Sequence, residues 1–470
     1  MVVQHNMQAA NANRMLNVTT SAQSKSTEKL SSGYKINRAA DDAAGLTISE
    51  KMRKQIKGLD RASTNAEDGV SAVQTAEGAL TEVHSMLQRM NELATQSANG
   101  TNSNTDRKAI QDEIDQLTTE IDRVSETTKF NETYLLKGDG AEKAHNVNAH
   151  DAGLDGVTLA DKGDEVEVTL KTLNAGDKVS IAGKNYTIGG VTADVTTLLD
   201  NAKITGKDGD KVTINGTEYT YYSKADNNTA VKKAGFFAKQ PTAAEAANAS
   251  AAYTVDEIKA LKGATITAGG KSVTTIDDVN GVDKNDSSVI TAAKAYELET
   301  AEIVKASSIG TDTAATTKAG ATADKFTLTK GKVNYNDALS FNLHVGADAD
   351  MTNKITVNID SMNSAGLGVK GIKADTEQDA TYAIDAIADA ISTVSSQRSA
   401  LGAVQNRLEH TINNLDNVVE NTTSAESRIR DTDMAEEMVN YSKNNILAQA
   451  GQSMLAQANQ SNQGVLSLLQ

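Results

Sequence analysis

Small and apolar residues recur at steps of three and four along the stretch from Ile48 to Ala94. The mean step is about 3.5 residues, the period of an α-helix that holds one narrow apolar stripe against another helix. No proline interrupts this stretch, and charged side chains fill its other faces. The pattern predicts a helix about 70 Å long, which needs helical partners along its whole length.

Two further stretches carry the same helical period. One runs from Ile110 to Val124, and Asn104 or Thr105 is expected to cap its first turn. The polar segment from Ser97 to Asn104 is a short turn, so this helix is predicted to be an antiparallel neighbour of the long one. The other stretch runs from Ile384 to Val419 and predicts a helix of several heptads near the C-terminus.

The two ends of the chain resemble each other in composition. Both residues 1–40 and the segment from Asp431 to Gln470 are rich in Asn, Gln, Ser and Ala, with a sparse helical stripe. Neither end buries enough apolar surface alone to offset the entropy cost of ordering. The C-terminal stripe consists of Leu447, Ala450, Met454, Ala458, Ser461, Val465 and Leu468.

The middle of the chain contains short alternating runs that predict β-strands. Asn215-Gly216 between two alternating runs predicts a hairpin, and Ala268–Lys271 marks another turn. Helices are expected within this region near Ala243–Ala252 and Val289–Ser307. A further hairpin is predicted from two alternating runs that follow it, Phe341–Val345 and Ile355–Ile359.

The simplest fold has mainly α terminal halves. Long antiparallel heptad helices from the N- and C-terminal regions pair into a rod, and the β-rich middle is an insertion at its far tip. The boundaries expected from these changes of texture are residues 1–40 and 429–470 for the terminal helical domain, 41–139 and 336–428 for the heptad-helix rod with its hairpin, and 140–335 for an insertion of one or two β-rich subdomains.

Composition excludes several classes of protein. The 470 residues include no cysteine, so disulfides, thiol catalysis and cysteine-ligated metals are excluded. The net charge is −16 and no stripe is dense in lysine or arginine, which argues against nucleic-acid binding. No run of apolar residues is long enough to span a membrane. The first residues lack the charged and apolar regions of a signal peptide.

Motifs for catalysis or for cofactors are weak. Gly366–Gly371 matches GxGxxG, but five residues separate it from the expected strand at Ile355–Asp360 and no βαβ unit surrounds it. A joint leading into the following helix is the better interpretation. His145 and His150 lie in a polar loop without metal-ligand spacing. The chain is therefore expected to have no catalytic, metal or cofactor site and not to be an enzyme.

Four long motifs carry a family resemblance. The segments Ile36–Leu46, Leu87–Thr101, Ala425–Ala435 and Ala456–Gln460 resemble the terminal signatures of bacterial flagellin, in the same order along the chain. The resemblance covers roughly residues 1–140 and 335–470, and leaves out the middle of the chain.

The resemblance implies a structural subunit that self-assembles into the bacterial flagellar filament for motility. Contacts between subunits must be head-to-tail, because only such contacts propagate into an open helix. It also implies export of the unfolded chain through the flagellar type III apparatus, an extracellular location, and an export chaperone at about Met434–Gln470. No nucleic-acid partner and no membrane insertion are expected. The residues assigned to self-assembly are Leu447, Ala450, Met454, Ala458, Val465 and Leu468.

The resemblance also implies recognition of the free monomer by the flagellin-sensing Toll-like receptor of the host. Arg89, Leu93, Gln96 and Glu113 match the contact positions of the family. Helical spacing puts the first three on one face, which Glu113 can approach from the antiparallel neighbour. The alternative is a solvated face with an interhelical ion pair that serves subunit packing, and both roles are compatible.

Two other functions remain open at this point. A flagellin-like junction protein or a coiled-coil surface adhesin would stay monomeric when seeded with filament ends. An enzyme carried by the insertion would need a pocket of converging carboxylates with perturbed pKa values within residues 140–335.

Overall fold

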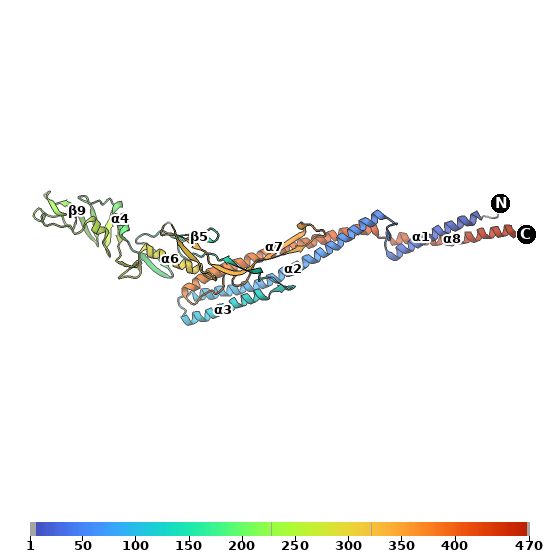
Figure 1. The fold of residues 1–470 in the computed structure, drawn as a ribbon, viewed down its shortest axis with the longest axis horizontal. Coiled ribbons are helices and arrows are strands. Elements are labelled where there is room, and N and C mark those ends of the chain that lie inside the picture. The colour runs from blue at the N-terminus through green and yellow to red at the C-terminus, as the bar shows by residue number, and fades with distance from the viewer. Residues whose placement is uncertain (1–5, 227, 321, 468–470) are drawn as a thin grey trace. The chain divides into compact units, whose positions relative to one another are not determined.

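The computed structural model describes residues 6–226, 228–320 and 322–467 (Figure 1). The chain forms two compact units. The terminal unit contains the residues up to Gln74, Ser340–Val357 and the residues from Ala400 onward. The central unit contains Thr75–Leu339 and Asn358–Ser399. Long N- and C-terminal helices and a β-rich region between them in sequence confirm the predicted fold class.

Helix α1 (Met7–Ser32) and helix α8 (Met434–Ser467) lie side by side and antiparallel in the terminal unit (Figure 1). The Asn6 side chain caps α1 by accepting a hydrogen bond from the Ala9 N–H, and its amide donates to the carbonyl of Ala458 at 3.2 Å. At the other end of the pair, Lys29 Nζ lies 3.6 Å from Glu437 Oε2. Gly33, with φ of 78°, then ends α1.

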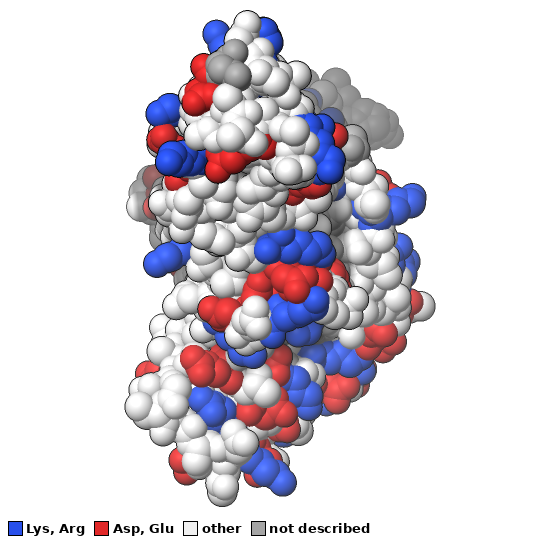
Figure 2. Space-filling model, turned by 90° about the vertical axis from the view of Figure 1, so that its left-hand side faces the viewer, with Lys and Arg blue, Asp and Glu red and all other residues white. Residues whose placement is uncertain are grey.

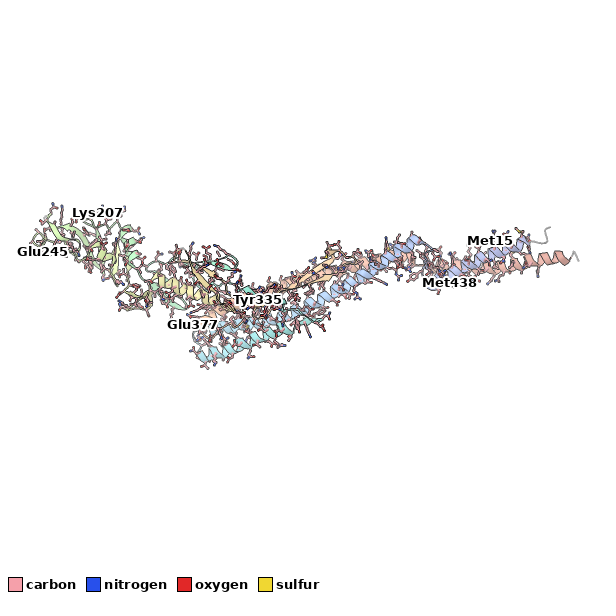
Figure 3. The ribbon with its side chains drawn as sticks, in the orientation of Figure 1. Met15, Lys207, Glu245, Tyr335, Glu377 and Met438 are labelled. Atoms are coloured by element: carbon pink, nitrogen blue, oxygen red, sulfur yellow. The ribbon has the colours of Figure 1, made fainter. Side chains whose placement is uncertain are left out.

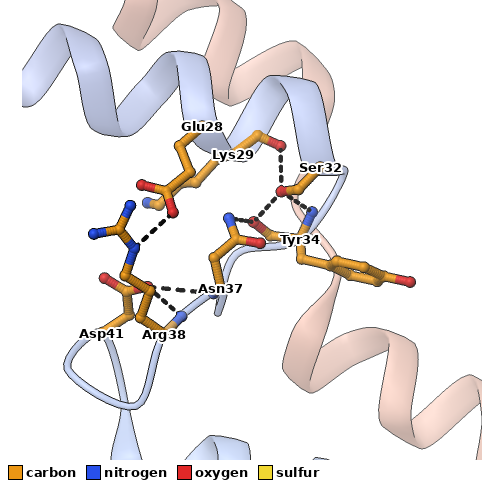
Figure 4. A network of polar contacts seen from close by, with 7 residues as sticks. All are labelled: Glu28, Lys29, Ser32, Tyr34, Asn37, Arg38 and Asp41. Atoms are coloured by element: carbon orange, nitrogen blue, oxygen red, sulfur yellow. Dashed lines mark hydrogen bonds and ion pairs between the residues drawn. The ribbon is translucent and has the colours of Figure 1, made fainter.

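A polar network connects α1 to the next helix (Figure 4). The carboxylate of Asp41 accepts hydrogen bonds from the backbone N–H groups of Asn37 and Arg38, and these bonds hold its pKa below the usual range, that from Arg38 most strongly. The Arg38 guanidinium also contacts Glu28 at 2.9 Å. These contacts, together with the buried side chain of Ile36, fix the path of the chain between the two helices.

Two longer helices, α2 (Ala43–Ser97) and α7 (Glu377–Arg430), contribute to both units. In the terminal unit they run antiparallel, since Ser49 bonds Glu426 at 2.6 Å and Ser63 bonds Asp416 at 3.1 Å. Their seam is apolar and buried, and it includes Leu59, Ala62, Ala66, Leu408 and Leu415.

The predicted hairpin packs on this seam and is confirmed. It consists of β19 (Leu339–His344) and β20 (Lys354–Ile359), joined by a loop with the short 3-10 helix η1 (Met351–Asn353). Gly69 of α2 lies under the hairpin, because a Cβ atom there would come 2.2 Å from Leu343 Cδ1. A glycine at this position therefore allows the hairpin to approach the helix closely.

The helical part of the central unit consists of the rest of α2, the start of α7 and α3 (Asn104–Thr127). Its core is built from the predicted heptad positions, with Leu80, Leu87 and Ile114 fully buried. The expected cap of α3 was wrong by one or two positions. Ser103 is the N-cap and forms a capping box with Asp106, because its hydroxyl can accept from the N–H of that residue.

The β-rich part of the central unit contains two five-stranded sheets, a four-stranded sheet and two strand pairs. The first five-stranded sheet has the order β10 (Ala230–Phe237), β9 (Thr217–Lys224), β8 (Lys211–Ile214), β11 (Thr265–Ala268) and β12 (Lys271–Thr274). Helices α4 (Thr192–Asn201) and α5 (Val255–Lys259) close its core.

The second five-stranded sheet has the order β13 (Asp278–Val279), β14 (Val282–Asp283), β15 (Val289–Ile290), β7 (Lys184–Ile188) and β6 (Lys178–Ile181). The four-stranded sheet has the order β16 (Thr316–Ala319), β17 (Lys325–Thr329), β5 (Glu165–Thr169) and β4 (Thr158–Asp161). Helix α6 (Ala292–Ala306) shares one core with both sheets. The strand pairs are β18 (Lys332–Asp337) with β3 (Asp139–Asn146), and β1 (Lys129–Phe130) with β2 (Thr133–Tyr134).

Local sequence signals in this region were partly right. The hairpin at Asn215-Gly216 is confirmed, and both residues have positive φ, 49° and 82°. The helix expected near Ala243–Ala252 was wrong, because this segment forms turns. Its alanines favour helix locally, but they pack against β10 instead, with Ala246 buried there. Figure 2 views the protein from the side of this region and shows acidic and basic side chains interspersed.

Candidate functional site

The interface between α1 and α8 is built from small residues. Ser26 and Ala448, with exposed fractions of 4% and 9%, are the only buried side chains of these two helices within the described part. Gly451 faces α1, where a Cβ atom would lie 3.4 Å from Leu16 Cδ1. The half-buried positions of α8 follow helical spacing and include Asn444, Leu455 and Ala458. The pair is therefore close but nearly without an apolar core.

Leu16, Leu30 and Leu455 are half-buried, but nine other large apolar side chains of the two helices are exposed. Their exposed fractions run from 47% at Leu447 to 72% at Met7. The set consists of Met7, Met15 and Val18 on α1, and Met434, Met438, Val439, Ile446, Leu447 and Met454 on α8. Met15 and Met438 are labelled in Figure 3. We call these nine residues together the outer apolar face; on α8 they extend around most of the helix surface that does not face α1. An unpartnered apolar surface on two paired helices is typical of a protein–protein interaction site.

The predicted self-assembly residues fall on different sides of α8. Leu447 and Met454 belong to the outer apolar face, Ala450 is also exposed, and Ala458 is half-buried toward α1. Val465 and Leu468 lie outside the residues whose side chains the structure describes. Periodicity alone could not tell which of two adjacent stripes faces α1, because that choice is made by the small residues that let two helices approach closely.

The second predicted surface lies on α2 and α3. Arg89 Nε donates to Glu113 Oε1 at 2.9 Å, and Arg89 Nη1 donates to Glu92 Oε2 at 3.1 Å. The hydrogen bond to Glu113 raises the pKa of Arg89. Gln96 is exposed on the same helix, whereas Leu93 is only 2% exposed. The structure thus brings Arg89 and Glu113 together and places Leu93 in the core beneath them.

Motifs for other chemistry gain no support from the geometry. Gly366–Gly371 lies in turns between β20 and α7, where a Cβ on Gly366 would meet the carbonyl of Ser361 at 2.3 Å. His145 stacks on Tyr335, with the ring centroids 4.0 Å apart. The described residues contain no group of three or more potential metal ligands. Among these residues, no helix is long and apolar enough to cross a bilayer.

One buried acid was missed by the sequence reasoning. Glu299 on α6 is 4% exposed, and its Oε2 atom has no hydrogen-bond partner within the described part of the chain. Burial raises its pKa to about 7. The sequence does contain a signal for this burial, because Glu299 continues the helical spacing of the buried Tyr296, Ile303 and Ala306. An acid at an apolar position of a helix indicates a buried carboxyl group.

Comparisons with known proteins give a consistent result. The family model of the bacterial flagellin N-terminal helical region matches residues 3–141, and that of the bacterial flagellin C-terminal helical region matches residues 384–469. A flagellin of Clostridium tyrobutyricum is 41% identical, with 98% of this chain and 100% of that protein covered. A flagellin of Salmonella typhimurium is 37% identical over 97% of this chain and 96% of its own length.

Solved structures give a weaker likeness. The structure of FliC from Burkholderia pseudomallei is 18% identical, covers 72% of this chain and 99% of its own, and has a TM-score of 0.26. The assignment to a family rests on the sequence relatives and not on this structure.

Proposed function

Since the chain belongs to the bacterial flagellin family, and is thus a structural subunit of the extracellular flagellar filament and not an enzyme, we propose that α1 and α8 carry its self-assembly contacts. The alternatives of a junction protein or an adhesin are not favoured, because relatives named flagellin match almost the full length. The observation that carries the proposal is the outer apolar face.

The outer apolar face suits an interface between identical subunits. Its side chains are methionine, valine, isoleucine and leucine, and they leave water when a second subunit covers them. Burial of one such side chain is worth about 1.5–3 kcal/mol. The contact must join this face to a different surface of the next subunit, because only head-to-tail contacts extend into a filament. Ordering of the terminal helices is then coupled to assembly.

We also propose that different segments of the chain form different parts of the filament. Residues 1–40 and 429–470 would form the filament-core domain, and residues 41–139 and 336–428 the domain around it. The insertion, residues 140–335, would face solvent. Its interspersed charges agree with a solvated surface (Figure 2).

Seeded polymerisation of purified monomer tests the role of the outer apolar face. Ile446, which is 68% exposed, is replaced in the variant Ile446→Gln. We expect the monomer to fold as before and to lose pelletable filaments. Val279→Gln is the matched control, because Val279 is also exposed (53%) but lies on β13 of the insertion. The control should polymerise like the parent protein.

Equal polymerisation of Ile446→Gln and the parent protein would contradict the proposal. A deletion from Met434 onward is the stronger version of the test. It should abolish filaments while circular dichroism still reports the α2–α7 helices, because their seam is closed without α8.

Export and chaperone binding are proposed from the family resemblance. The chain would leave the cell unfolded through the flagellar type III apparatus, and a flagellin chaperone would bind Met434–Gln470. The exposed apolar side chains of α8 support a chaperone site, since they need cover before assembly. Co-purification of the chaperone with the full chain, but not with a chain that ends before Met434, is the expected result. Equal recovery with both chains would refute it.

Recognition by the Toll-like receptor is proposed for the surface of Arg89, Gln96 and Glu113, with Leu93 packed beneath. The three polar side chains are exposed and lie on neighbouring helices. Arg89→Ala should weaken binding of monomer to the receptor ectodomain. Arg123→Ala is the control, because Arg123 forms a similar exposed ion pair with Glu120 elsewhere on α3. A receptor that binds both variants equally well would argue against this surface.

A further inference from the structure

The central unit contains a cavity of about 750 Å³ that the filament function does not use. It lies among β6, β7, α6 and the first turns of α7. Leu154, Leu173 and Val179 provide an apolar wall. Glu377 at the start of α7, labelled in Figure 3, is also part of the lining. The volume falls within the range of about 300–1,000 Å³ typical of small-molecule sites.

Glu299 is the buried acid of this cavity. Glu302, one turn further along the same helix, makes a useful comparison, because its exposed fraction is 7% against 4% for Glu299. Glu302 has two partners, since Tyr382 Oη donates to it at 2.5 Å and Lys305 Nζ contacts it at 2.8 Å. Glu299 lines the cavity, and its Oε2 has no such partner within the described residues. A buried carboxylate without a hydrogen-bond donor is unfavourable, so Glu299 lacks a donor that a ligand in the cavity could supply.

The exposed part of the lining contains three lysines and two acidic residues. Lys171 is engaged with Asp155 at 2.8 Å. Lys178 and Lys184, by contrast, are exposed and have no ion pair among the described residues. Glu377 is also exposed at this rim. The site therefore combines a buried acid without a donor and two lysines without a carboxylate.

We propose that this cavity binds a zwitterionic small molecule of the amino-acid type. Its ammonium group pairs with Glu299, and its apolar portion packs on Leu154 and Leu173. Its carboxylate group is held by Lys184, which the β6–β7 register places on the same face as the buried Ile181, while Lys178 adds positive charge at the rim. An ammonium donates a charge-assisted hydrogen bond to the buried carboxylate, which water or an apolar ligand cannot match. A free amino acid and a short peptide share this chemistry.

Calorimetric titration of the full-length monomer tests the site. The probes are L-leucine, L-leucyl-L-leucine, leucinamide, which lacks the carboxylate, and 4-methylpentanoate, which lacks the ammonium. At least one of the two zwitterions, leucine or the dipeptide, should bind saturably. The one that binds more tightly shows whether the ligand is a free amino acid or a short peptide. Both single-charge analogues should bind at least about tenfold more weakly, as expected for loss of a charged hydrogen bond.

Variants separate the site from general effects on folding. Glu299→Gln keeps the size of the side chain and should weaken binding of the better zwitterion about tenfold or more. Glu297→Gln is the control on the same helix, because Glu297 is exposed and pairs with Lys294. The double variant Lys178→Met and Lys184→Met changes only exposed side chains and should also weaken binding.

Three results would each overturn the proposal. These are no saturable binding of either zwitterion, binding of 4-methylpentanoate as strong as that of the zwitterions, and unchanged affinity in the folded Glu299→Gln protein. If Glu299→Gln does not fold, the double lysine variant decides, and unchanged affinity there overturns the proposal. None of these results bears on filament assembly, which is measured separately.

Discussion

Two antiparallel helix pairs in the terminal unit differ in what lies between the helices. Between α2 and α7, Leu59, Ala66, Leu408 and Leu415 are each less than 10% exposed. Between α1 and α8, the buried side chains of the described part are Ser26 and Ala448. The two pairs have the same arrangement, but only the first encloses an apolar seam.

This difference separates folding from assembly. The α2–α7 seam removes large apolar side chains from water within one chain, so a single subunit can hold it together. The α1–α8 pair leaves most of its large apolar side chains exposed, so it gains most of its burial only when other subunits cover them. Mutations in the first pair should therefore act on stability, and mutations in the second on polymerisation.

The largest expected effect comes from Leu408→Ala in the seam. Leu408 is fully buried and packs with Ala66 and Ile355. Truncation of a buried leucine removes apolar burial and leaves a cavity, which costs about 2–5 kcal/mol. Denaturant unfolding followed by circular dichroism checks this loss. A loss below about 1 kcal/mol would show that the seam is not what stabilises this pair.

A change of pH should alter the stability of the central unit but not that of the α2–α7 seam. The pKa of Glu299 is raised from 4.5 to about 7, so the folded state favours the protonated acid. The free energy of unfolding of the central unit is therefore highest below about pH 4.5. It falls as the pH rises toward 7, by about 3 kcal/mol in total. Glu299→Gln removes this dependence, because glutamine stays neutral.

Hydrogen exchange at pH 5 and pH 8, corrected for intrinsic rates, measures this effect locally. Amides of α6 should be better protected at pH 5 in the parent protein and in Glu297→Gln, and equally protected at both values in Glu299→Gln. Amides of the seam near Leu408 provide the comparison and should show no such change. Equal protection of α6 at both pH values in the parent protein would contradict the assignment.

Gly69→Ala probes how closely the hairpin approaches the seam. A new Cβ atom would lie 2.2 Å from Leu343 Cδ1 and 3.3 Å from Leu408 Cδ1. The overpacking costs about 1–3 kcal/mol, and the better helix propensity of alanine returns about 1 kcal/mol. We expect a net loss of about 1 kcal/mol in thermal or denaturant unfolding.

Gly402→Ala is the matched control for this substitution. Gly402 lies in α7 of the same unit, and a Cβ atom there meets nothing within 4 Å. The control should gain about 1 kcal/mol from helix propensity alone. The opposite signs of the two substitutions are the decisive result, and a gain in both would mean that the hairpin yields without cost.

The sequence predicted the parts of this fold that depend on local pattern. The heptad positions Leu80, Leu87 and Ile114 are core residues, and Asn215-Gly216 forms its hairpin, because periodicity and turn chemistry act over a few residues. The turns near Ala246 were missed, since packing against β10 overrides the helix preference of alanine.

The candidate sites were less predictable, because they depend on which elements meet. Leu447 and Met454 were identified as one stripe, but only the structure shows that they point away from α1. Arg89 and Glu113 could be paired from helix spacing and the length of the turn. The cavity at Glu299 joins residues that are far apart in the sequence, so the position of Tyr382 or Lys178 around it could not be inferred.

The smallest expected effect on stability is the most informative about assembly. Met454→Ala removes a large apolar side chain, as Leu408→Ala does, but Met454 is 62% exposed. No cavity forms in the monomer, so the free energy of unfolding should change by less than about 0.5 kcal/mol. In a filament the same truncation removes buried contact area, so the critical concentration for seeded polymerisation should rise. A monomer as strongly destabilised as Leu408→Ala would mean that α8 has already buried its apolar face in the single subunit, and the distinction between the two helix pairs would fail.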